Sequence, residues 1–267
     1  MLTKWVGRLI GINVALYMLG YLPGTGQLLN NFVLVPGAEF LVRPWTLVTY
    51  AFLHGGFMHL LFNMIGLFFF GPRLEDRLGS RSFLQLYAWG VIGGAVFHFL
   101  PLILGSAVPP VIGASGAIYG IVICFAMLWP RERIYLWMVV PVPAWLLASV
   151  LVFGALFAGI TAQSGSNVAH LAHFGGALCA GVYLRTLRLK YQAKQRQYKA
   201  IVKDTKDILT KMTASEVEYW SKVDLDTLHA VNREEVERLL AKARQGDRIL
   251  TGTEVETLRR LALQLKT

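Results

Sequence analysis

The chain has 267 residues, 55% of them hydrophobic, and its mean hydropathy is +0.49. These values exclude an ordinary soluble domain and indicate several apolar segments of bilayer length. The net charge of +10 is divided into +4 for residues 1–184 and +6 for residues 185–267. Because basic residues beside a membrane are explained by orientation and by anionic lipid, no nucleic-acid partner is predicted.

Six apolar segments follow one another along the chain, each bounded by proline, glycine or charge. They span residues 5–22, 51–70, 83–104, 115–129, 136–160 and 167–187. The first lacks a small-x-small cleavage pattern before Pro23, so we expect a retained helix and not a signal peptide. Residues 23–50 are too apolar for a free linker and are expected to lie partly in the membrane interface. The sequence therefore predicts an all-α membrane protein with six transmembrane helices.

Lysine and arginine predict the orientation. Seven of them flank the N-terminus and the loops after the second and fourth segments: Lys4, Arg8, Arg73, Arg77, Arg81, Arg131 and Arg133. The alternate loops hold only Arg43. By the positive-inside rule, both termini are predicted to be cytoplasmic. The expected location is the plasma (inner) membrane of a bacterium, as a multi-pass protein.

The polar tail is predicted to be helical. After a membrane domain at residues 1–187, residues 188–211 are expected to form a basic helical linker, and residues 212–267 a small cytoplasmic helical appendage. Ser215-x-x-Glu218 has the spacing of a capping box and predicts a helix start. A cytoplasmic partner, self-association and regulation of the membrane domain are alternative roles for this tail.

The motif Gly113-Ala114-Ser115-Gly116 lies at the head of the fourth segment, which starts at Ser115. Because Gly116-x-x-x-Gly120 fits a close contact between helices, one interpretation of this motif is packing. A serine at a helix N-terminus also lies beside free backbone N–H groups and a dipole that favours an anion. These are the features of an oxyanion hole, so Ser115 is a candidate nucleophile.

Two other segments carry polar groups suited to the same chemistry. His59 and Asn63 lie on one face of a helix and can both donate hydrogen bonds, either to an oxyanion or to a neighbouring helix. His173 lies among small residues that allow another helix to approach, whereas His170 lies one turn nearer the loop. We therefore prefer His173 as the general base.

Helix lengths place these groups at a similar depth. The fourth segment is about 22 Å long and the hydrocarbon core about 30 Å thick, so Ser115 is expected roughly 8–10 Å below the outer surface. His173 is expected about 9 Å deep by the same rise per residue. A polar helix start at that depth must line a wet cavity, and hydrolysis needs that water.

Carboxylates are scarce in the membrane domain, which holds only Glu39, Glu75, Asp76 and Glu132. The last three are expected on the cytoplasmic side, and Glu39 stays an open alternative as a third catalytic member. We therefore predict a Ser–His dyad, with Tyr119 stacked on the imidazole. The histidine spacings lack the His-Glu-x-x-His pattern of zinc hydrolases, so neither a metal nor another cofactor is expected.

These motifs together resemble the rhomboid intramembrane serine proteases over residues 5–187. The likeness is carried by Gly113-Ala114-Ser115-Gly116, His54-x-x-x-x-His59-x-x-x-Asn63, Ala172-His173-x-x-Gly176 and Phe70-Gly71-Pro72-Arg73-Leu74-Glu75. It implies a six-helix rhomboid-like bundle with Ser115 as nucleophile and His173 as base. It further implies an oxyanion hole of His59, Asn63 and the Ser115 N–H, with Gly113, Gly116, Tyr119 and His54 in support.

The resemblance also implies a movable cap at residues 161–166. One departure concerns the first outer loop, where many members have Trp-Arg and this chain has Arg43-Pro44-Trp45. The anchoring of that loop is therefore expected to differ.

The function that this resemblance implies is cleavage of transmembrane segments through an acyl-enzyme, with entry between the second and fifth segments. The expected partners are transmembrane protein substrates and the lipid bilayer. Two other classes stay open. A non-catalytic rhomboid-like protein would bind or escort membrane clients, and a helix-packing scaffold or transporter would have no water at Ser115.

Overall fold

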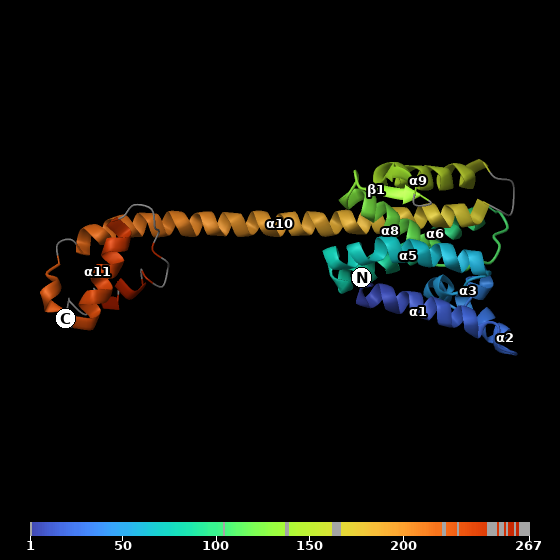
Figure 1. The fold of residues 1–267 in the computed structure, drawn as a ribbon, viewed down its shortest axis with the longest axis horizontal. Helices are drawn as coiled ribbons and strands as arrows, with labels where there is room; N and C mark the ends of the chain where they lie inside the picture. The colour runs from blue at the N-terminus through green and yellow to red at the C-terminus, as the bar shows by residue number, and fades with distance from the viewer. Residues whose placement is uncertain are drawn as a thin grey trace. The chain divides into compact units, whose positions relative to one another are not determined.

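The computed structural model describes residues 2–103, 105–136, 139–161, 167–220, 223–228 and 230–244, together with 250, 254, 256–258, 260 and 261. The chain divides into two compact units, Met1–Arg188 and Leu189–Thr267 (Figure 1).

The first unit is mostly helical, and each predicted apolar segment contains one long helix or part of one. These helices are α1 (Lys4–Leu19), α5 (Phe57–Leu78), α6 (Ser80–His98), α8 (Ser115–Leu128), α9 (Ala144–Thr161) and α10 (Asn167–Trp220). The shorter helices are α2 (Thr25–Asn30), α3 (Ala38–Val42), α4 (Thr46–Thr49), η1 (Tyr50–Phe52) and α7 (Leu100–Ile103). Within the described residues, three helical stretches are long and apolar enough to cross a membrane: Phe57–Leu78, Ser80–Ile103 and Ala144–Thr161.

The all-α prediction is wrong at the start of the fifth apolar segment. Arg133–Leu136 (β1) and Val140–Pro143 (β2) pair as an antiparallel hairpin, and α9 begins only at Ala144. Pro141 and Pro143 cannot supply the backbone donors that a helix interior needs, and the valines beside them favour extended structure.

Two predicted helix starts also differ. α5 begins at Phe57, not near residue 51, because Gly55 and Gly56 separate it from η1, and it continues through Pro72 to Leu78. Ser215 lies inside α10, which is continuous to Trp220, so the helix start predicted there is wrong. Residues 188–214 contain no glycine or proline to end the preceding helix.

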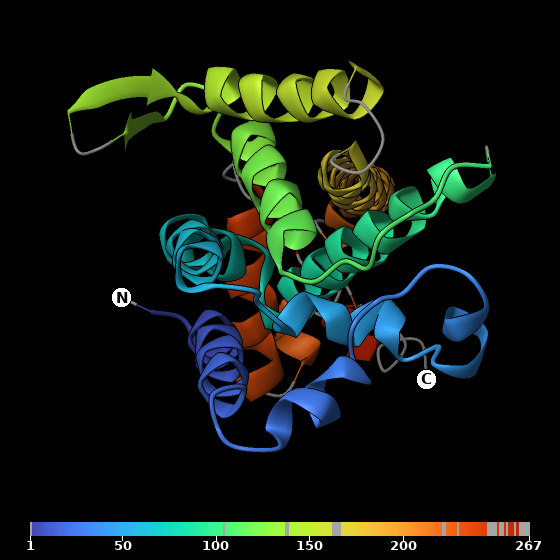
Figure 2. The ribbon, with the colours of Figure 1, turned by 90° about the vertical axis from the view of Figure 1, so that its right-hand side faces the viewer.

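Small residues let the central helices approach closely. Seen along the bundle, α8 lies at the centre, surrounded by α5, α6, α9 and α10 (Figure 2). A Cβ added at Gly120 of α8 would lie 2.7 Å from the Cβ of Ala180 in α10, and one at Gly90 of α6 would lie 2.8 Å from the Cα of Ala117. Because lipid provides no hydrophobic drive between helices, such close packing holds the unit together.

Glu75 joins the end of α5 to the start of α1. Its carboxylate accepts hydrogen bonds from the Thr3 hydroxyl, from the Val6 N–H at 3.1 Å and from the Ser80 hydroxyl at 2.7 Å. The Trp5 N–H also donates to it, at 3.1 Å. The first turn of a helix has free N–H groups and a positive dipole end, so a carboxylate there stabilises α1.

The second unit has its own apolar core. It contains the later part of α10, η2 (Leu225–Thr227) and α11 (Ala230–Arg244). The buried core residues are Trp220, Val236, Leu239, Leu240, Leu250, Leu258 and Leu261.

Candidate active site

Ser115 and His173 meet although 58 positions separate them in the chain. Ser115 is the first residue of α8, and His173 lies six residues into α10. The Nε2 atom of His173 is 2.7 Å from the Oγ atom of Ser115. This is hydrogen-bond distance, at which a proton passes directly from a hydroxyl to an imidazole.

Tyr119 fixes the plane of the His173 ring. It lies one helical turn after Ser115, and the two ring centroids are 4.4 Å apart with an interplanar angle of 9°. The Nδ1 atom of His173 is buried and makes no hydrogen bond to the described residues. Stacking and helix packing therefore orient the imidazole, where a carboxylate does so in a triad.

The carboxylates of the first unit are engaged elsewhere or exposed. Glu39, the alternative left open by the sequence, pairs with Arg43 at 3.5 Å. Glu132 pairs with Arg73 at 3.0 Å, and Glu75 joins α1 as described above. Asp76 is exposed. These contacts give no support to a third acidic member of the candidate site.

The other candidate base, His170, lies beside the pair. Its ring centroid is 6.3 Å from that of His173, at an interplanar angle of 77°. The hydrogen bond to Ser115 is made by His173. Among the described residues, no group of three or more His, Cys, Asp or Glu side chains could hold a metal ion.

His59 reaches the segment before Ser115 because Gly113 has no side chain. A Cβ at Gly113 would lie 2.5 Å from the Nε2 atom of His59, and Gly113 has a φ of +120°. Glycine is therefore required there for both space and backbone conformation. The His59 ring is also edge-on to His54, with centroids 5.0 Å apart.

Asn63 makes a local hydrogen bond. Its Nδ2 atom donates to the backbone carbonyl of His59 at 2.9 Å. The Asn63 side chain is buried and lies on the same face of α5 as His59. This bond uses one of the two N–H donors of the amide, and the second can still donate to an oxyanion.

Tyr50 is a positioning residue that the sequence analysis missed. Its hydroxyl donates to the Val91 carbonyl of α6 at 2.8 Å, and its own carbonyl accepts from the Gly113 N–H at 2.9 Å. Tyr50 therefore links the segment that precedes Ser115 to α6. The available signal was a tyrosine four residues before His54 in an otherwise apolar stretch.

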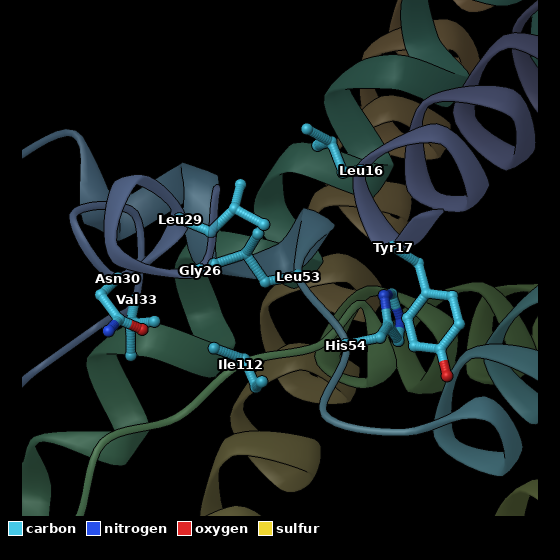
Figure 3. Close-up of a pocket in the computed structure, with 9 residues that line it drawn as sticks. All are labelled: Leu16, Tyr17, Gly26, Leu29, Asn30, Val33, Leu53, His54 and Ile112. Carbon is cyan, nitrogen blue, oxygen red and sulfur yellow. The ribbon is translucent and has the colours of Figure 1, made fainter. Parts of the chain in front are cut away.

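A cavity of about 180 Å³ lies next to this region and borders His54 (Figure 3). Its lining residues are Leu16, Tyr17, Gly26, Leu29, Asn30, Val33, Leu53, His54 and Ile112. Since His54 also contacts the His59 ring, the cavity reaches to within one side chain of the candidate oxyanion donors. A space of this size, with polar groups in its wall, can hold water.

The segment between α1 and α5 is anchored by Trp45. Its indole N–H donates to the Asn31 carbonyl at 2.9 Å, while Arg43 pairs with Glu39. The altered Arg-Pro-Trp order thus leaves the tryptophan in an anchoring role. In the cap predicted at residues 161–166, residues 162–166 lie outside the described part of the chain.

Comparison with known proteins identifies relatives of the chain. The rhomboid domain matches residues 42–190. Rhomboid protein 1, mitochondrial, of Saccharomyces cerevisiae is 34% identical over 194 residues, covering 72% of this chain and 55% of the yeast protein. RHOMBOID-like protein 12, mitochondrial, of Arabidopsis thaliana is 35% identical over 175 residues, covering 60% of this chain and 52% of the plant protein.

A bacterial relative is also similar. The Bacillus subtilis protein named Putative rhomboid protease YdcA is 36% identical over 156 residues, covering 58% of this chain and 71% of the relative. The chain spans about half the length of the yeast and plant relatives. Residues 42–190, which the rhomboid domain matches, include His59, Asn63, Ser115, Tyr119 and His173.

Proposed function

The chain belongs to the rhomboid family, and we propose that it is an intramembrane serine endopeptidase that cleaves transmembrane segments of membrane proteins. The observation that carries this proposal is the 2.7 Å contact between the Ser115 hydroxyl and the His173 imidazole at the start of an apolar helix. It is supported by the multi-span helical membrane fold that the rhomboid domain implies and by the Bacillus subtilis relative that is named a putative rhomboid protease.

The first half-reaction forms an acyl-enzyme. The Ser115 Oγ attacks the scissile carbonyl carbon while the His173 Nε2 takes its proton. The tetrahedral oxyanion accepts hydrogen bonds from the Ser115 N–H, His59 and Asn63. When the C–N bond breaks, His173 returns the proton to the leaving amine, and the C-terminal fragment of the substrate departs with a new N-terminus.

The second half-reaction releases the other fragment. Water gives a proton to His173 as it attacks the ester carbonyl, and the ester bond to Ser115 then breaks with return of that proton to the serine. The cavity beside His54 is a source of this water within the bundle. In this proposal six helices cross the membrane, both termini are cytoplasmic, and the protein resides in a bacterial plasma membrane.

Cleavage of a reporter transmembrane substrate in proteoliposomes tests this function. Ser115→Ala removes the nucleophile and His173→Ala removes the base, so each is expected to lower kcat at least about 10³-fold. Both variants should keep the helical content and melting temperature of the parent chain. Activity that survives in either variant at more than a tenth of the parent rate contradicts the assignment.

A stable parent chain that cleaves no transmembrane substrate, yet binds one, would instead establish the non-catalytic rhomboid-like alternative.

A further inference from the structure

The β1–β2 hairpin takes no part in the proposed reaction, yet its composition is distinctive. Seven of its eight strand residues are apolar or aromatic, and the exception is Arg133 at the start of β1. Val139 is 75% exposed, Tyr135 58% and Val140 47%. The hairpin extends sideways from the beginning of α9, away from the other helices of the first unit (Figure 2). A lateral projection of this kind from a membrane bundle faces lipid or the interface.

The prolines of β2 determine which backbone groups face outward. Tyr135 lies opposite Pro141 and Arg133 opposite Pro143. Because proline has no N–H, these two pairs cannot carry the ladder hydrogen bonds, which must lie at the alternate pairs, Ile134 with Val142 and Leu136 with Val140. Any other residue at positions 141 and 143 would place an unpaired backbone N–H group on the outer edge of β2.

The unpaired backbone groups at the edges of the hairpin determine how deeply it can lie in the membrane. An unpaired backbone group in hydrocarbon costs several kcal/mol, so an ordinary strand edge is excluded from the bilayer core. The two prolines remove donors from the β2 edge, but its outward carbonyls and the edge of β1 still need water. The hairpin is therefore suited to the membrane–water interface, where apolar side chains and hydrated carbonyls are both accommodated.

The base of the hairpin is held firmly. The Ala144 N–H donates to the Glu132 carbonyl at 2.8 Å, and the Trp145 N–H donates to the Pro130 carbonyl at 3.1 Å. Arg73 of α5 pairs with the Glu132 carboxylate, and its guanidinium lies 4.4 Å from the centroid of the Trp129 ring. These contacts join the hairpin to the start of α9 and to the adjacent ends of α5 and α8.

The charges beside the hairpin and the apolar surface that continues from it indicate that lipid covers the hairpin. Arg131 and Arg133 are exposed beside the apolar strands, and Arg73 neutralises the intervening Glu132. Exposed cations at this level complement anionic lipid headgroups. Beyond the hairpin, the apolar exposed surface continues along α9 at Trp145, Val150, Phe153, Phe157 and Ile160. The same lipid that covers α9 in a bilayer therefore meets the hairpin.

We propose that the β1–β2 hairpin is an interfacial lipid anchor, in which Tyr135, Val139 and Val140 contact acyl chains just below the cytoplasmic headgroups. Arg131 and Arg133 bind anionic headgroups beside them. The anchor fixes the cytoplasmic end of α9. This inference rests on the membrane topology proposed above and is independent of peptide cleavage.

Depth-dependent quenching tests the anchor. The full chain with Cys124→Ala and Cys179→Ala receives one cysteine, by Val139→Cys, which is labelled with an NBD fluorophore and reconstituted in phosphatidylcholine–phosphatidylglycerol vesicles. Phe153→Cys on the exposed face of α9 provides the deep control, and Glu234→Cys on α11 provides the aqueous control. Nitroxide lipids labelled near the headgroup should quench residue 139 more than lipids labelled near the chain end, with the reverse order at residue 153 and no quenching at residue 234.

Two outcomes overturn the anchor. If the fluorophore at residue 139 is unquenched, as at residue 234, the hairpin faces water and its apolar surface is free for a protein partner. If it is quenched most from the chain ends, the hairpin is not interfacial. Repeating the measurement with Ser115→Ala separates this inference from the enzymatic proposal, because the quenching should be unchanged in a chain that cannot cleave.

Discussion

Tyr119 contacts the candidate catalytic pair through its ring. It is stacked on His173 at 4.4 Å, and no described contact of the imidazole depends on its hydroxyl. An aromatic pair is worth about 1 kcal/mol, so Tyr119→Ala is expected to lower kcat about fivefold to tenfold. Tyr119→Phe keeps the stacked ring and should retain most of the activity. Steady-state cleavage of a fluorescent transmembrane peptide measures both, and an equal loss in the two variants would show that the hydroxyl matters.

Gly113 is required for the position of His59. Gly113→Ala places a Cβ 2.5 Å from the His59 Nε2 atom, so the ring must move away from the approach to Ser115. Gly79→Ala is the matched control, because Gly79 also has a positive φ, of +78°, but has open space around it. We expect both variants to lose stability from backbone strain, and only Gly113→Ala to lose kcat, by about 10² if His59 is an oxyanion donor. Equal kcat values for the two would remove His59 from the site.

Single residues were predictable from sequence where chemistry restricts the choice. A serine at the head of an apolar helix and a histidine among small residues were predictable in this way, and they meet at 2.7 Å. The local hydrogen bond of Asn63 and the positioning role of Tyr50 were not, because both depend on side-chain rotamers and on neighbours distant in sequence. Sequence patterns specify which groups are available, whereas packing determines what each group faces.

At the level of elements, the attachment of α1 depends on one carboxylate. Glu75 accepts two backbone and two hydroxyl hydrogen bonds at the start of this helix. Glu75→Gln replaces one acceptor oxygen by an NH2 group, which faces donors and cannot accept from them. We therefore expect the free energy of unfolding to fall by about 1.5–3 kcal/mol. Asp76→Asn, an exposed neighbour of the same chemistry, should cost less than about 0.5 kcal/mol. Thermal unfolding in detergent compares the two variants. Similar melting temperatures would show that the Glu75 hydrogen bonds do not stabilise the attachment of α1.

The positions of helices were easier to predict than their ends. Apolar content located all six segments, but it cannot distinguish a helix from a buried or interfacial strand over a few residues. The segment from residue 136 illustrates this limit, since its alternating valines and prolines form the hairpin. The capping pattern at Ser215 failed for a related reason, because a helix start needs a preceding stop that the sequence there does not contain.

At the scale of the whole molecule, the chain forms two compact units, Met1–Arg188 and Leu189–Thr267. Each unit has a hydrophobic core of its own. The rhomboid domain match ends at residue 190, and the residues of the candidate site lie in the first unit. The interfacial hairpin and the small-residue contacts around α8 belong entirely to the first unit.

Fluorophosphonate labelling of the membrane-reconstituted chain tests the central claim most directly, because it requires an activated serine and not merely a buried one. The parent chain should be labelled at Ser115 alone, Ser115→Ala should not be labelled, and His173→Ala should be labelled at least about 10²-fold more slowly. Labelling of the parent chain that is absent, or that persists in Ser115→Ala, would contradict the assignment of this serine and histidine as a catalytic pair.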